Sequence, residues 1–100
     1  MDQSLDSNEI KKHLANLQLA WNVVNDNKQL EYEFRFPTYD EALEFLNKVA
    51  EIAKVENHHP DICIYYNKIK ITTWTHSVNG LSVKDFKIAM LIENVFKPPF

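Results

Sequence analysis

The chain has 100 residues and a mass of 11.8 kDa, which is the size of one domain and excludes two separate hydrophobic cores. Hydrophobic residues make up 45% and charged residues 25% of the chain, so disorder over most of its length is excluded. The formal net charge of -3 argues against a basic surface for nucleic acid phosphates.

The sequence shows no pattern typical of secretion or membrane insertion. Residues 1–12 lack the basic and then apolar pattern of a secretory signal, and no apolar run approaches the roughly 20 residues of a membrane span. Cys63 has no second cysteine with which to form a disulfide within the chain. We therefore expect a soluble cytoplasmic protein whose single domain spans residues 1–100.

The first third of the chain predicts a helix followed by a hairpin. The helix begins after a cap at Asp6 or Ser7. Its apolar face comprises three residues at helical spacing: Ile10, Leu14 and Leu17. Two strands are expected over residues 21–24 and 30–36, joined by the polar turn 25–28. Apolar and charged residues alternate in the second strand, which predicts one buried and one solvent-facing side.

A second helix and a second hairpin follow. Thr38 and the glutamate three residues later have the spacing of a capping box, and apolar residues recur at helical spacing to about Val55. Residues 61–66 and 69–75 predict two strands, because they are rich in β-branched and aromatic side chains. A tight turn at residues 67–68 is expected to join them.

A third helix is expected near the end of the chain. Ser82 and Asp85 form its capping signature, and the helix ends near Phe96, before two prolines. The order of elements is helix, two strands, helix, two strands, helix, without a pattern of long parallel crossovers. This order predicts an α+β fold, in which a four-stranded antiparallel sheet has three helices packed on one face.

The last helix is apolar around more of its circumference than packing against one sheet requires. Its two apolar stripes are Val83, Phe86, Ala89 and Met90, and Ile88, Leu91, Ile92 and Val95. The second stripe needs a partner, which is either another helix of this chain or the same helix of a second subunit. We expect this stripe to be exposed on a monomer and therefore buried in an oligomer.

Three of the four histidines, His58, His59 and His76, lie between the end of the second helix and the end of the last strand. Pro60 stiffens the backbone and keeps His59 out of the helical conformation. If the two strands of the second hairpin pair, the end of one returns beside the start of the other. We therefore expect the three histidines to converge in one concave pocket.

Three kinds of chemistry suit such a cluster. Imidazole donates and accepts protons near neutral pH, which favours acid and base catalysis. A metal site of the histidines with Cys63 is the second, although the usual paired spacings of zinc ligands are missing. The third is structural, with the histidines as satisfied polar groups of a turn. Cys63 itself lies in an apolar strand, so we expect a buried and inert thiol.

The pattern around these histidines resembles the signature of the pterin-4a-carbinolamine dehydratases, also called 4a-hydroxytetrahydrobiopterin dehydratases. The residues that carry the resemblance are Lys54, His58, His59, Pro60, Tyr66, Asn67, Thr75, His76, Gly80, Leu81, Ser82 and Asp85. Weaker agreement extends back to Trp21. The resemblance therefore covers nearly the whole chain, and the family fold is the α+β fold expected above.

The resemblance implies removal of water from 4a-hydroxytetrahydropterin to give quinonoid dihydropterin, which recycles the pterin of aromatic amino acid hydroxylases. It assigns His58 and His76 as an acid and base pair, and His59 to binding and orienting the pterin. It implies no cofactor and no metal, because the pterin is the substrate. The expected pocket residues are Asn57, His58, His59, Trp74, Thr75, His76 and Ser77. Lys54 and Asp85 are expected to modulate the site.

The chain departs from the family pattern near the histidines, at Lys54, Asn57, Ile62 and Trp74. Many members have an acidic residue where this chain has Lys54, one helical turn before His58. We expect the Lys54 cation to disfavour the protonated histidine, so Lys54→Glu is expected to raise activity or shift the pH optimum upward. Trp74 stands where a small polar residue is common.

The resemblance also implies partners. Family members form dimers, by joining sheets, or tetramers, so we expect a homo-oligomer. Some members act as dimerisation partners of a homeodomain transcription factor through their helical surface. The alternative function is therefore a non-catalytic coactivator module that binds a transcription factor, without direct contact to nucleic acid or membrane.

Overall fold

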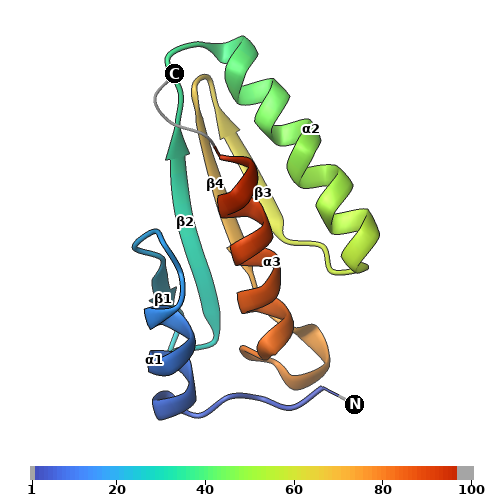
Figure 1. Cartoon of the computed structure of the whole chain (residues 1–100). Helices are drawn as coiled ribbons and strands as arrows, with labels where there is room; N and C mark the ends of the chain where they lie inside the picture. The colour runs from blue at the N-terminus through green and yellow to red at the C-terminus, as the bar shows by residue number, and fades with distance from the viewer. Residues whose placement is uncertain (1, 97–100) are drawn as a thin grey trace.

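The computed structural model describes residues 2–96 (Figure 1). Its elements are α1 (Ser7–Ala15), β1 (Asn22–Val24), β2 (Gln29–Arg35), α2 (Tyr39–Glu56), β3 (Asp61–Tyr65), β4 (Lys68–Thr73), the 3-10 helix η1 (His76–Val78) and α3 (Val83–Val95). The predicted order of helices and strands is confirmed. The prolines expected to follow the last helix lie outside the described residues. Within those residues, no helix is long and apolar enough to cross a membrane.

The four strands form one antiparallel sheet in the order β1-β2-β4-β3, and the helices lie on one face of it (Figure 1). The predicted α+β architecture is therefore confirmed. On the covered face of the two central strands, Phe34 lies opposite Ile69 and Tyr32 lies opposite Ile71. Phe34, Ile69 and Ile71 have no exposed surface, so the core lies between these strands and the helices.

The starts of the helices follow the capping residues. Asp6 caps α1 and Thr38 caps α2, each accepting a hydrogen bond from a backbone N–H three residues later. At α3, Ser82 and Asp85 form a reciprocal capping box. Such caps satisfy N–H groups that have no partner within the helix, which is why short sequence motifs locate these helix starts well.

The turn between β3 and β4 lies one residue earlier than predicted. It comprises Tyr66, whose φ is 55°, and Asn67. The backbone N–H of Phe36 donates to the Asn67 carbonyl at 2.9 Å, and Asn67 Nδ2 donates to the Phe36 carbonyl at 2.8 Å. The turn is therefore fixed by contact with the end of β2. Because the turn comes one residue earlier, β4 begins at Lys68. It ends at Thr73, whereas residues 69–75 were expected.

The second apolar stripe of α3 is covered within the chain. Ile88 and Ile92 have no exposed surface, and Leu91 and Val95 are half-buried. The expectation that this stripe is exposed on a monomer is wrong, because α2 packs against α3. A charged side chain at Ile92 would therefore disrupt the core. The exposed large apolar residues of α3 are Val83 and Met90.

Glu93, near the end of α3, fixes the segment between α1 and β1. Its buried carboxylate accepts hydrogen bonds from the backbone N–H groups of Gln18 and Leu19, at 3.0 and 2.7 Å, and from Trp21 Nε1 at 2.8 Å. These partners are more than 70 residues away in the chain. Local pattern therefore gives no signal of this contact.

Replacing Glu93 by glutamine is expected to lower the free energy of unfolding by about 1–3 kcal/mol, because a neutral amide leaves buried donors without their charged acceptor. Urea denaturation measures this change. Glu44→Gln, at an exposed position of α2, is the matched control and is expected to change stability by less than about 0.5 kcal/mol. Equal unfolding midpoints for the two variants would contradict a structural role for Glu93.

Candidate functional site

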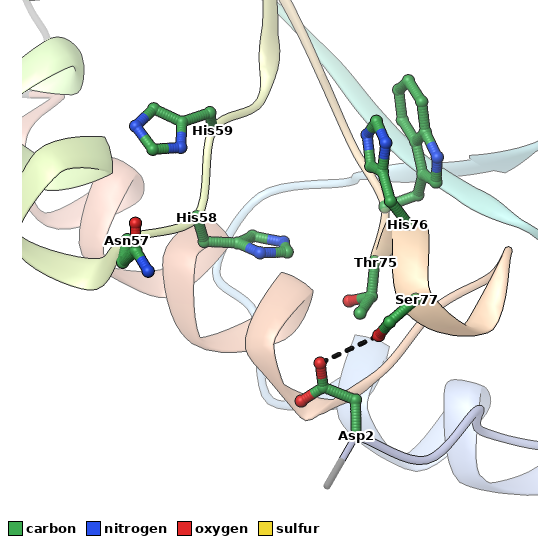
Figure 2. A pocket seen from close by; sticks show the side chains of 8 residues that line it. Asp2, Asn57, His58, His59, Thr75, His76 and Ser77 are labelled. Atoms are coloured by element: carbon green, nitrogen blue, oxygen red, sulfur yellow. Dashed lines mark hydrogen bonds between the residues drawn. The ribbon is translucent and has the colours of Figure 1, made fainter.

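A cavity of about 330 Å³ opens between the C-terminal end of α2 and the segment that follows β4 (Figure 2). The residues that line it are Asp2, Asn57, His58, His59, Trp74, Thr75, His76 and Ser77. All seven residues expected in the pocket therefore line one cavity. Asp2, from the N-terminal segment, is the residue that the sequence analysis missed.

The backbone explains why distant histidines converge. Asn57 is the C-cap of α2, and its left-handed conformation has a φ of 50°, which asparagine tolerates better than most residues. On the other side, Asp61 at the start of β3 pairs with Thr72 near the end of β4. The residues before β3 therefore lie beside those after β4. Figure 2 shows His58 and His59 across the cavity from His76, with the rings of His58 and His59 pointing in different directions.

His58 is held by the buried carboxylate of Asp85. His58 Nε2 lies 2.7 Å from Asp85 Oδ1, and the two side chains are 12% and 0% exposed. Asp85 also accepts hydrogen bonds from Thr73 Oγ1 at 2.6 Å, Thr75 Oγ1 at 2.8 Å and the Ser82 backbone N–H at 3.1 Å. Asp85 is therefore both the cap expected from the sequence and the anchor of a histidine.

This arrangement determines which nitrogen of His58 is available. An ionised carboxylate only accepts hydrogen bonds, so His58 Nε2 is the nitrogen that donates to Asp85. His58 Nδ1 is then the ring nitrogen that Asp85 does not hold. A carboxylate in this position fixes the orientation and the tautomer of the imidazole ring.

His76 is held in a different way. Its ring stacks on Trp74 with centroids 4.5 Å apart and an interplanar angle of 9°. The His76 imidazole is exposed, whereas Trp74 is half-buried. The indole therefore orients an imidazole that is otherwise surrounded by solvent. The spacing of two residues on an extended segment could have indicated this contact, because such residues face the same side.

Two other candidates lie away from the cavity. The Lys54 side chain is 71% exposed, and its Nζ lies 3.6 Å from Glu51 Oε1. Cys63 is exposed on the sheet face that the helices do not cover, so the expectation of a buried thiol is wrong. Across the described part of the chain, no group of three or more His, Cys, Asp or Glu side chains is placed to hold a metal ion.

The position of Lys54 changes the result expected for Lys54→Glu. An exposed charge is screened by water and salt, so its influence on the histidines is small. We now expect the variant to leave the activity and its pH profile within about twofold of the original chain. An upward shift of the pH optimum would show that Lys54 acts on the site, and Lys54→Met would separate loss of the cation from gain of a carboxylate.

Comparison with known proteins identifies the family of the chain. The family model described as pterin 4 alpha carbinolamine dehydratase matches residues 3–95. The chain belongs to this family. It is similar to a protein of Alkaliphilus metalliredigens, with 42% identity over 89 residues that cover 89% of this chain and 79% of the relative. A relative in Sulfolobus acidocaldarius is 38% identical over 91 residues, which cover 91% of this chain and 97% of the relative. Both are provisionally named pterin-4-alpha-carbinolamine dehydratase.

Solved structures share the fold. The crystal structure of a transcriptional coactivator/pterin dehydratase from Brucella melitensis has a TM-score of 0.87 at 28% identity, covering 92% of this chain and 97% of that one. A pterin dehydratase-like protein identified as a RuBisCO assembly factor in the alpha-carboxysome has a TM-score of 0.68 at 19% identity, covering 77% and 89%. The second likeness shows the fold alone.

Proposed function

We propose that this protein dehydrates 4a-hydroxytetrahydropterin to quinonoid dihydropterin and so recycles the pterin of aromatic amino acid hydroxylases. The observation that carries the proposal is the placement of three histidines around one cavity, one of them anchored by a buried carboxylate, in a member of this family. The pterin is the substrate in this proposal, and the reaction needs no resident cofactor.

The reaction requires two proton transfers. The bond between C4a and the hydroxyl oxygen breaks, and the oxygen leaves as water after accepting a proton. The bond between N5 and its hydrogen breaks, and a double bond forms between C4a and N5. There is no net oxidation or reduction, so one acid and one base at fixed positions are sufficient.

His58 and His76, which line opposite sides of the cavity, suit these two transfers. His58 is the base in this proposal, because Asp85 stabilises the imidazolium that forms when Nδ1 takes the N5 proton. His76 is the acid that protonates the leaving hydroxyl, with its ring oriented by Trp74. His59 and Asn57 line the cavity beside them and are assigned to binding and orienting the pterin.

A direct assay tests the activity. The carbinolamine is generated in situ by a pterin-dependent hydroxylase or supplied chemically, and formation of quinonoid dihydropterin is followed by absorbance. We expect a rate above the spontaneous dehydration that increases in proportion to the concentration of the protein. A rate equal to the spontaneous one at all concentrations would refute the proposal.

We also propose that the protein is a homo-oligomer. β3 pairs with β4 on one side, and within residues 2–96 its other edge is open. Open strand edges pair readily with other chains, and a two-fold dimer is the usual solution for identical subunits. Light scattering at micromolar concentration distinguishes a dimer or tetramer from a monomer.

A coactivator module is the second candidate function. The observation that favours it is the exposure of apolar side chains on the helices: Val55 of α2 is 78% exposed and Val83 of α3 is 57% exposed. The related Brucella melitensis protein is described as a transcriptional coactivator as well as a pterin dehydratase. Binding of the dimerisation helix of a homeodomain transcription factor would support this function, and His58→Ala would leave such binding unchanged.

A further inference from the structure

The N-terminal segment supplies one wall of the cavity. Asp2 lies next to Ser77 in Figure 2, and its Oδ2 accepts a hydrogen bond from Ser77 Oγ at 3.0 Å. Lys84 Nζ, at the start of α3, lies 3.0 Å from Asp2 Oδ1 and 3.2 Å from Oδ2. Three residues later, the Leu5 backbone N–H donates to the Leu81 carbonyl at 2.8 Å. The segment is therefore attached at both of these points.

The Asp2 carboxylate is ionised and retains acceptor capacity. The hydrogen bond from Lys84, followed by that from Ser77, lowers the pKa of Asp2 below its ordinary value. Its side chain is 23% exposed, so it is partly withdrawn from water while still lining the cavity. A carboxylate offers about four lone-pair positions, which is more than these two partners use. Among the residues shown to line the cavity, Asp2 is the one carboxylic acid.

The chemistry of a pterin matches this carboxylate. A pterin is a 2-amino-4-oxopteridine, and its 2-amino group and N3–H form two adjacent donors on the pyrimidine ring. The reacting C4a and N5 lie on the other side of the same small bicycle. With the histidines at the reacting atoms, a second part of the cavity must contact the pyrimidine edge, and paired N–H donors bind carboxylates especially well.

We propose that the Asp2 carboxylate accepts hydrogen bonds from the 2-amino and N3–H groups of the pterin and so selects pterins over lumazines. This inference rests on the proposed function, because it uses the same cavity and substrate class. In a lumazine the 2-amino group is replaced by a carbonyl, whose oxygen would face the carboxylate. A site built to accept a hydrogen bond discriminates against an analogue that lacks the donor.

The test is a calorimetric measurement of the binding of two stable probes, pterin and lumazine. We expect the original chain to bind pterin about tenfold or more tightly than lumazine, which is the usual value of a hydrogen bond to a charged group. In Asp2→Asn this preference is expected to fall to within about threefold, mainly through weaker binding of pterin. Glu44→Gln removes the same charge at an exposed position of α2 and is expected to retain the full preference.

Lys84→Met separates recognition from mere attachment of the segment. It removes the ion pair and keeps the carboxylate, so we expect the preference for pterin to persist. Loss of the preference in Lys84→Met as complete as in Asp2→Asn would overturn the inference, as would an unchanged preference in Asp2→Asn. If either result accompanies normal dehydration, the proposed function stands. Failure of the original chain to bind either probe would also overturn the inference, and the dehydration assay would then decide the proposed function separately.

Discussion

Replacement of His58 or His76 by alanine is expected to lower the rate of carbinolamine dehydration by about 10²-fold or more, the usual contribution of one positioned acid or base. Each variant lacks one of the two groups that we propose to exchange protons with the substrate. Steady-state kinetics separate loss of catalysis from loss of binding. His59→Ala is expected to raise KM more than it lowers kcat.

His13 provides the matched control for these substitutions. It lies on α1, outside the cavity, and its ring stacks on Phe86 with centroids 5.1 Å apart. His13→Ala therefore removes an aromatic contact without removing a proposed proton carrier, and its kcat is expected to stay within about threefold of the original chain. A kcat that survives in both His58→Ala and His76→Ala would contradict the assignment of the two histidines.

Asp85→Asn is expected to reduce kcat by about 10-fold or more, because the carboxylate holds His58 in one tautomer and orientation. The amide has nearly the same shape, but it no longer provides the charged acceptor for His58 Nε2. Because Asp85 acts through His58, a second readout is required. The NMR signal of the proton on His58 Nε2 is expected to change in this variant.

A second variant, Asp85→Ala, separates the effect of Asp85 on stability from its effect on His58. Asp85→Ala leaves the hydroxyl groups of Thr73 and Thr75 and the Ser82 N–H without their acceptor, and is expected to cost about 3 kcal/mol or more. Asp85→Asn retains an acceptor oxygen and is expected to cost less. Normal kcat and an unchanged His58 spectrum in a folded Asp85→Asn variant would show that Asp85 serves only as a helix cap.

Features encoded by neighbouring residues could be predicted from the sequence. The helix starts follow from local caps such as Asp6 and Thr38, and strands follow from alternation within a few residues. Convergence of the histidines also follows, because pairing of two consecutive strands requires the end of β4 to lie beside the start of β3. The α+β fold and the convergence of the histidines could therefore be predicted from the sequence.

Features that depend on distant residues could not be predicted in the same way. Asp85 was identifiable as a cap, but its contact with His58 joins residues 27 positions apart through the packing of α3. The cover of Ile92 depends on where α2 lies, and the exposure of Lys54 depends on the direction of its side chain. Asp2 gave no signal, because its place beside the cavity is set by contacts with Ser77 and Lys84.

The most direct test of histidine acid and base catalysis compares the original chain with the double variant His58→Ala, His76→Ala at equal concentrations of folded protein. Formation of quinonoid dihydropterin from the 4a-carbinolamine is measured against the spontaneous rate. We expect clear acceleration by the original chain and a rate near the spontaneous background for the double variant. Turnover by the double variant at the original rate, or no acceleration by the original chain, would contradict the central claim.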